Sequence, residues 1–512
     1  MELPTKFKRI DEAKDLGFLE VTSFKCLGLY IFHPSLGTSA QHSYHKFLVF
    51  AWHNLGRPLV ELVNLAINII NEYQSGLLKG VLDIDIHDVY QSGLDFAHTW
   101  ICTFLYSDFI GPENEENREN IKDLLRKIAE LDGEDFDGIA IEEEEEDQDE
   151  KKKWWLYDEK EEEEKEEPPL ICDLDADIGQ IKLYLDNLDQ NLPVVDLPLL
   201  IQPVTFTDEE FNNDKSIPFP LRADSDVISH HFFYTGLRIY NQIKYHEYIN
   251  CCWQKDNKES TSPHIVELEN HFQKTAAIIT DSILTTDDLE LRIHVIEKWI
   301  DIMEAALNEN NYLFLFEIDG TLSKPPISKL KVIWRDVNPE SMQKYRKLQE
   351  ITSTYKRYST YKSKLSKLST FRESLPYINP WLTEMWLISN SKTTDFLQTY
   401  RQQWSYFNKV EFLRQPWGVD MGFLLNKELL DEIDNYIPIL NDDDSINEKA
   451  QFAERSAILS PIKPSTSSPF SSQFSPKSPF STNSIFSPKS PFSPKTPYSP
   501  KTPSYTYYLE KH

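Results

Sequence analysis

Cysteine is scarce in this 512-residue chain, and the few cysteines follow no ligand spacing. They are odd in number, without a C-x-x-C pair, and stand at Cys26, Cys102, Cys172, Cys251 and Cys252. Two adjacent thiols do not readily bridge each other, so the last pair does not predict a disulfide. This usage argues against a disulfide framework, predicts no metal site and is typical of reduced thiols in a cytosolic protein.

Long apolar runs are also missing. No segment approaches the ~18 uninterrupted apolar residues that a membrane-spanning helix requires. The first nine residues, Met1 to Arg9, lack the apolar core of a signal peptide. We therefore expect a soluble cytoplasmic protein.

Positively charged residues are fewer than acidic ones, and the net charge is −30. This excess of negative charge argues against nucleic-acid binding along the chain. Residues 132–167 carry twenty acidic residues against five lysines, which predicts a solvated spacer. Residues 324–372 instead carry thirteen lysines and arginines against three acidic residues. A solvated helix face explains most of these charges, but they also form a candidate surface for an acidic protein or an anionic membrane. Docking of the acidic run on this basic stretch is a further alternative.

Helical patterns dominate the rest of the sequence. Residues 44–131 carry apolar residues at spacings of three and four, as an amphipathic helix does. Later in the chain Ile293, Ile296 and Ile300 recur at the same spacing behind Asp287, which we predict to be the N-cap of their helix. The fold class that follows is all-α, with a smaller helical domain before a larger one.

Changes in composition predict the boundaries. We expect a helical region at 1–131, an acidic low-complexity linker at 132–169, an extended connection with short helices at 170–221, a second helical domain at 222–440 and a disordered tail at 457–512. In the tail the string Ser-Pro-Lys-Ser/Thr-Pro occurs four times. Each Ser-Pro or Thr-Pro is a candidate site for phosphorylation by proline-directed kinases, which would make a basic tail acidic.

One short string within residues 310–334 suggests hydrolysis. Phe316-Glu-Ile-Asp-Gly-Thr321 is similar to the aspartyl-phosphate loop of haloacid-dehalogenase-type phosphatases. That chemistry needs an aspartate nucleophile two residues before Asp319, where this chain has Glu317. The longer side chain would misplace the carboxylate by about 1 Å, and the flanking patterns do not predict a parallel α/β sheet. A phosphatase is therefore only a remote alternative.

The whole segment from Asn310 to Trp334 resembles the Asn-Asn-Phe-Asn…Ile-Ser-Arg-Leu…Trp stretch in the catalytic domain of Ras-type guanine-nucleotide exchange factors. Other elements of that family have counterparts in the same order, at Phe233–Trp253, Ser262–Ile265, Arg292–Ile300, Tyr358–Lys362 and Pro376–Ile378. The resemblance implies a helical domain with a protruding hairpin, no covalent chemistry, no cofactor and a Ras-family small GTPase as partner. It implies partner contacts at Arg292, Asn310, Asn311, Lys329, Tyr361 and Lys362.

The resemblance also implies how the hairpin would act. In that family it places an apolar side chain near the Mg²⁺ site and a carboxylate near the phosphate-binding loop of the GTPase. Alignment on Leu382-Thr383-Glu384 puts Trp386 at the apolar position and Asn390 at the acidic one, with Thr383 as part of the site. An ungapped alignment from Pro376 would choose Ser389 and Thr393 instead. Neither alignment supplies the acid, so an inactive GTPase-binding scaffold is the alternative to an exchange factor.

Some of these residues also have a plain structural interpretation. A large aromatic such as Trp386 usually packs in a core. Asn310 and Asn311 can cap or turn between helices, and Arg292 can be an ordinary surface cation. The N-terminal helical region occupies the place where many such factors carry a helical module that supports the hairpin, but no residue-level match links the two.

Overall fold

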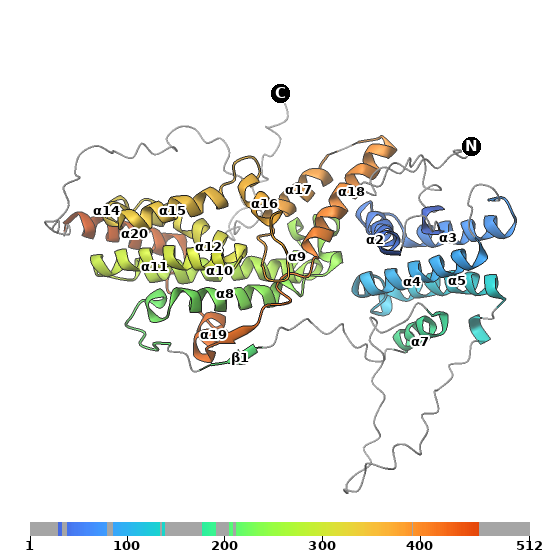
Figure 1. Cartoon of the computed structure of the whole chain (residues 1–512), viewed down its shortest axis with the longest axis horizontal. Helices are drawn as coiled ribbons and strands as arrows, with labels where there is room; N and C mark the ends of the chain where they lie inside the picture. The colour runs from blue at the N-terminus through green and yellow to red at the C-terminus, as the bar shows by residue number, and fades with distance from the viewer. Residues whose placement is uncertain are drawn as a thin grey trace, which may run out of the picture. The chain divides into compact units, whose positions relative to one another are not determined.

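The computed structural model describes residues 29–32, 38–78, 85–133, 136–138, 177–190, 204–207, 211–391 and 393–459. These residues form mainly helices, joined by loops and with one two-stranded sheet (Figure 1), which confirms the predicted all-α class. The acidic run from residue 139 and the tail from residue 460 lie outside the described residues, so what we predicted for them stays a prediction. None of the described helices is both long and apolar enough to cross a bilayer.

The N-terminal helical domain is built around contacts of α4 with α2 and α5 and of α3 with α5. Its elements are η2 (Tyr30–Phe32), α2 (Thr38–Asn54), α3 (Leu59–Gln74), α4 (Ile86–Asp108), η4 (Pro112–Asn114), α5 (Glu115–Asp132), η5 (Phe136–Gly138) and α7 (Ile178–Asp189). Helix α3 shows why they pack: Leu62, Ala66 and Ile69 lie on one helix face and are all buried.

Helix α7 comes from the segment where we predicted an extended connection, and it packs against α5. Asp189 at its end accepts hydrogen bonds from Arg118 Nε (2.5 Å) and Lys122 Nζ (2.5 Å) on α5. Asp186 makes a second ion pair with Lys122 at 2.9 Å. This part of the connection therefore belongs structurally to the N-terminal helical domain.

The second helical domain has a core in which α8, α10, α11 and α12 pack on one another. Its elements are β1 (Val204–Phe206), η7 (Phe219–Arg222), α8 (Ser225–Tyr240), η8 (Tyr245–Gln254), α9 (Lys258–Thr261), α10 (Pro263–Leu284), α11 (Leu289–Asn308), α12 (Tyr312–Leu322), α13 (Pro325–Ser328), α14 (Lys331–Asp336), α15 (Pro339–Thr352), α16 (Ser359–Leu365), α17 (Asn379–Ser389), α18 (Phe396–Leu413), β2 (Phe423–Leu425), α19 (Lys427–Asp434) and α20 (Asp443–Leu459).

Helix α11 follows the predicted pattern closely. Ile293, Ile296 and Ile300 are buried, as their spacing predicts. The prediction of Asp287 as the N-cap was wrong by one residue, because the side chain of Asp288 accepts the hydrogen bond from Leu291 N at 2.7 Å. Two adjacent aspartates offer the same capping group, and the sequence pattern does not distinguish them.

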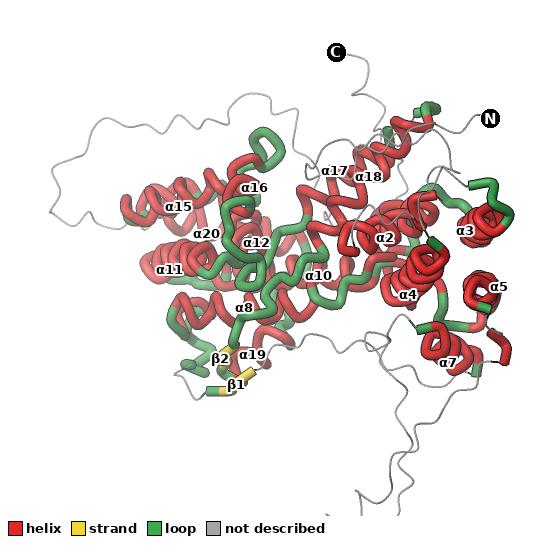
Figure 2. Tube along the Cα trace, turned by 45° about the vertical axis from the view of Figure 1, so that its right-hand side comes forward, coloured by secondary structure: helices red, strands yellow, loops and turns green. Residues whose placement is uncertain are grey.

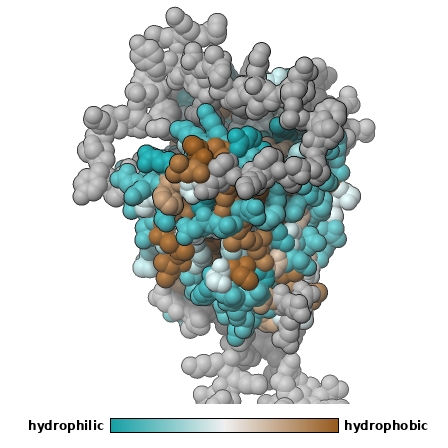
Figure 3. All heavy atoms as spheres, turned by 90° about the vertical axis from the view of Figure 1, so that its left-hand side faces the viewer, coloured by the Kyte–Doolittle hydropathy of each residue, from teal (hydrophilic) through white to brown (hydrophobic). Residues whose placement is uncertain are grey.

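Two features extend this domain beyond its predicted limits. Strand β1 lies before the predicted start at residue 222 and pairs in parallel with β2, with Val204 opposite Phe423. Helix α20 lies after the predicted end at residue 440 and packs on α10, α13 and α14. Figure 3 views the end of the molecule where α14 and α20 lie, and shows hydrophobic side chains in separate patches among hydrophilic ones.

Candidate functional site: the α17–α18 hairpin

Helices α17 and α18 pack against each other as a hairpin (Figure 2). Trp381 on α17 and Phe412 on α18 stack with ring centroids 4.8 Å apart. Leu382 and Met385 of α17 are fully buried. Helix α18 begins behind Asp395, whose side chain accepts a hydrogen bond from Gln398 N at 2.7 Å. The base of the hairpin is therefore a packed apolar layer, and its turn is polar.

Helix α17 and the residue that follows it carry the residues predicted to act on a GTPase. Trp386 and Thr383 are half-buried, while Asn390 is exposed and follows the last residue of the helix. The Asn390 amide donates a hydrogen bond to the backbone oxygen of Trp386 at 2.8 Å. The Asn390 side chain thus folds back on the last turn of α17, and the group at the predicted acidic position is a neutral amide.

Two carboxylates of the hairpin, Asp395 and Glu384, are already engaged. Asp395 caps α18, and Glu384 accepts a hydrogen bond from Lys362 of α16. Lys409 of α18 lies 3.6 Å from the other oxygen of Glu384. Burial lowers the pKa of Lys409, and the Glu384 carboxylate opposes that change by favouring the charged amine. Glu384 therefore connects α16, α17 and α18, and Lys362 serves an internal ion pair.

Asn310, Asn311 and Tyr361 contact the segment that leads into α17, at Leu375 and Tyr377. Asn311 has no exposed surface, and its side chain caps α12 by accepting a hydrogen bond from Phe314 N at 3.1 Å. Asn310 supplies the turn before it, with φ of 58°. Tyr361 is also fully buried, and its hydroxyl accepts from the backbone nitrogen of Tyr377 at 2.7 Å. For Asn311 and Tyr361 the structure therefore gives a positioning role in place of the direct partner contact that the resemblance implies.

Arg292 and Lys329 lie apart from this group. Arg292 is only 1 % exposed, and its guanidinium donates to the backbone oxygens of Ile283 (3.1 Å) and Thr286 at the end of α10. Burial lowers the pKa of Arg292. Arg292 thus donates hydrogen bonds to carbonyl groups left without partners at the end of α10. The sequence did not predict this role, because no pattern in it shows where α10 ends relative to α11. Lys329, after α13, is exposed.

The string that resembles a phosphatase loop lies within helix α12. The remote alternative of a phosphatase is therefore wrong. Glu317 is fully buried, with His271 Nδ1 2.9 Å from one of its oxygens. Asp319 accepts hydrogen bonds from the side chains of Tyr345 (3.1 Å) and Thr352 (2.7 Å) on α15. Both carboxylates therefore stabilise helix packing. The described part of the chain also holds no group of three or more histidine, cysteine, aspartate or glutamate residues suited to a metal.

The hairpin also contacts the N-terminal helical domain, through α2 beside α18 (Figure 2). Asn54, at the end of α2, donates a hydrogen bond to Gln403 Oε1 of α18 at 2.6 Å and accepts one from Asn250 N of η8 at 2.7 Å. Asn250 and Cys251 have φ near 50°, a left-handed conformation that is unusual outside glycine. No sequence pattern pointed to this junction, because its residues are far apart in the chain.

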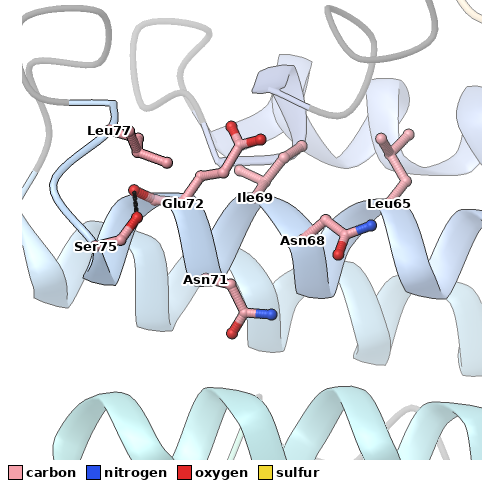
Figure 4. A pocket seen from close by; sticks show the side chains of 7 residues that line it. All are labelled: Leu65, Asn68, Ile69, Asn71, Glu72, Ser75 and Leu77. Carbon is pink, nitrogen blue, oxygen red and sulfur yellow. Dashed lines mark hydrogen bonds between the residues drawn. The ribbon is translucent and has the colours of Figure 1, made fainter.

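Two hollows on the described part of the surface do not resemble a catalytic cleft. One, of about 330 Å³, lies between α2 and α18 and is lined mainly by apolar side chains. The other, of about 490 Å³, lies along α3, where Ser75 donates a hydrogen bond to the backbone oxygen of Glu72 (Figure 4). Its lining residues are Leu65, Asn68, Ile69, Asn71, Glu72, Ser75 and Leu77.

Comparison with protein families gives the class: residues 227–411 match the RasGEF domain, and this part of the chain is a RasGEF domain. The match covers α8 to most of α18 and so contains the hairpin.

Three similar proteins are named as guanine nucleotide-releasing or exchange factors. Human Ras-specific guanine nucleotide-releasing factor 1 is 25 % identical over 147 residues, 29 % of this chain and 11 % of that protein. The mouse protein of the same name is 24 % identical over 201 residues, 38 % of this chain and 16 % of that protein. Ras guanine nucleotide exchange factor W of Dictyostelium discoideum is 25 % identical over 173 residues, 34 % of this chain and 15 % of that protein. The matched region thus spans between 11 % and 16 % of these relatives.

Proposed function

We propose that this chain is a guanine-nucleotide exchange factor that binds a Ras-family small GTPase in the cytoplasm and promotes release of its GDP. The observation that carries the proposal is the RasGEF domain at 227–411, which contains the α17–α18 hairpin. Trp386 and Asn390 stand together near the turn of that hairpin, where they can enter a partner's nucleotide site.

The proposed mechanism is a difference in binding, without covalent chemistry. The domain would hold the nucleotide-free GTPase more tightly than the GDP-bound form, and each tenfold acceleration requires about 1.4 kcal/mol of that preference. Trp386 would crowd the Mg²⁺ site, and Asn390 would hydrogen-bond the phosphate-binding loop. Rigid presentation supports this mechanism: Glu384 ties α17 to its neighbours, and Tyr361 and Asn311 support its start.

The test is release of a fluorescent GDP analogue from Ras-, Rap- and Ral-type GTPases in the presence of the full chain. We expect acceleration on at least one of them, reduced roughly 30-fold by Trp386→Ala, because truncation of an aromatic anchor costs about 2 kcal/mol or more. Ile437→Ala is the control, since it removes an apolar side chain that is 81 % exposed and lies outside the hairpin. Acceleration that survives Trp386→Ala would contradict the proposed placement of the hairpin.

A second candidate is a scaffold that binds the GTPase without exchanging its nucleotide. The observation in its favour is Asn390, a neutral amide that cannot repel phosphate by charge. Binding to nucleotide-free GTPase without faster GDP release would support the scaffold. In that case Asn390→Glu, which restores a carboxylate, should introduce exchange, whereas Asn390→Gln should not.

A further inference from the structure

One corner of the RasGEF domain carries cations without carboxylate partners. We define the basic corner as Arg346, Lys347, Lys356, Arg357, Lys364 and Lys367, on α15, on α16 and beside them. All six are exposed, and none forms an ion pair with any residue that the structure describes. Lys344 and Lys362 in the same segment are different, because they pair with Asp301 (2.6 Å) and Glu384. The unpaired charges are thus the ones that face solvent.

The loop between α15 and α16 presents part of this corner in an unusual backbone conformation. Lys356, Arg357 and Tyr358 have φ of 49°, 56° and 62°, so three consecutive residues other than glycine are left-handed. Such a conformation is costly for each residue with a side chain. The preceding Tyr355 is 68 % exposed, and Lys356 Nζ lies 5.3 Å from its ring centroid. The loop stands out above α16 in Figures 1 and 2.

The charge of the basic corner is not needed for packing, and of the strained residues only Tyr358 packs, against Phe316 and Tyr377. The residues that fasten α15 and α16 to the domain are Tyr345, Leu348, Tyr361 and Leu365, all buried. Two of the three strained residues, Lys356 and Arg357, are exposed cations next to the exposed Tyr355. Strain held at exposed side chains points to a function of the loop itself. A ligand for this corner must be anionic and must accept an aromatic side chain at its surface.

We propose that the basic corner binds the anionic headgroups of a phospholipid membrane, with Tyr355 at the boundary between headgroups and acyl chains. Cations near an anionic membrane surface attract it, and tyrosine is enriched at that boundary. A protein partner fits less well, because lysine is depleted from protein interfaces and these usually have an apolar centre. Four of the six cations are lysines, and Tyr355 is the one large exposed hydrophobic residue described between residues 341 and 370.

The net charge of −30 does not prevent this binding. Charges further away than about 8–10 Å are largely screened at physiological salt, so the surface nearest the membrane decides. Between residues 341 and 370 the chain has eight lysines and arginines and a single acidic residue, Glu350. The corner is thus a local cationic surface on an acidic protein.

The test is flotation of the full chain with vesicles of phosphatidylcholine alone or mixed with phosphatidylserine. We expect binding only to the mixed vesicles, and loss of binding at high salt. Each cation near the surface contributes roughly fivefold to partitioning, so Lys356→Gln/Arg357→Gln should weaken it about 25-fold. The matched control is Lys255→Gln/Lys427→Gln, which removes two exposed lysines elsewhere in the domain and should bind as the unmodified chain does.

Tyr355 provides a second, uncharged test. Tyr355→Ala should weaken flotation with mixed vesicles, and Tyr355→Trp should preserve it, since tryptophan favours the same boundary. GDP release measured without vesicles should be unchanged in all of these variants. Because flotation needs no GTPase, absence of exchange activity would refute the proposed function and leave this proposal intact.

Two outcomes would overturn the lipid proposal. One is that Lys356→Gln/Arg357→Gln floats to the same extent as the control Lys255→Gln/Lys427→Gln with mixed vesicles, including the case in which neither of them floats. The other is a corner variant that floats normally but loses binding to nucleotide-free GTPase in solution, which would make the corner a protein interface.

Discussion

Replacement of Asn54 by alanine should loosen α18 without disturbing the rest of the RasGEF domain. Asn54 is 9 % exposed and makes two hydrogen bonds across the junction, to Gln403 and from Asn250. Its removal leaves Gln403 Oε1 buried without that donor, and a buried unsatisfied group costs about 1–3 kcal/mol. The Asn250 amide is only half-buried, and water can replace part of its bond. We therefore expect a loss of about 2 kcal/mol, close to a 30-fold rise in local opening.

Hydrogen exchange of the backbone amides of α18 measures that opening directly. Exchange should accelerate around Gln403 in Asn54→Ala but not in Asn64→Ala, which removes an exposed asparagine of α3. A double-mutant cycle with Gln403→Ala should be non-additive, because each single change already removes the shared bond. Unchanged protection of α18 in Asn54→Ala, or simple additivity in the cycle, would refute the role given to this junction.

Two further predictions concern stability. Glu384→Gln should lower the urea midpoint of unfolding by the equivalent of about 1–2 kcal/mol, because it weakens the charged contacts to Lys362 and Lys409. The control is Glu448→Gln, at an exposed glutamate of α20. An equal effect of the two substitutions would contradict the role given to Glu384. Burial lowers the pKa of His45 to about 4. As the pH falls below 6.5, His45 is therefore protonated in the unfolded chain but stays neutral in the folded chain until about pH 4. Stability should therefore fall across that window by up to about 3 kcal/mol, and a parallel fall in His45→Gln would show that another group is responsible.

Periodicity predicted the fold class and the buried face of α11, because three-to-four spacing directly reports which side of a helix is apolar. It failed at Asp287, where two adjacent aspartates offer the same cap and only the backbone distinguishes them. It also did not predict that α7 would join the N-terminal helical domain. That helix is held by ion pairs such as Arg118–Asp189, between residues 71 positions apart, and no local pattern reports such contacts.

For the candidate site, the sequence indicated the hairpin region but not the roles of individual residues. Asn311 and Tyr361 stood out in motifs, yet both are buried. A motif shows that a residue type is found at a given position in a family. That residue can either support the site from within the fold or contact the partner directly. Asn54 belongs to no motif, since its role depends on two segments that meet only in the folded chain. The alignment that chose Trp386 and Asn390 stays a prediction.

The parallel pairing of β1 with β2 bears on where the chain can be shortened for expression. A fragment that starts at residue 222 would lose Val204–Phe206 and the hydrogen bond from Thr207 N to Leu425 O at 2.9 Å. Phe423–Leu425 would then present an unpaired apolar edge, and its middle residue, Leu424, is already 53 % exposed. Bare strand edges recruit other chains, so such a fragment should aggregate. One that begins before residue 204 keeps the edge covered.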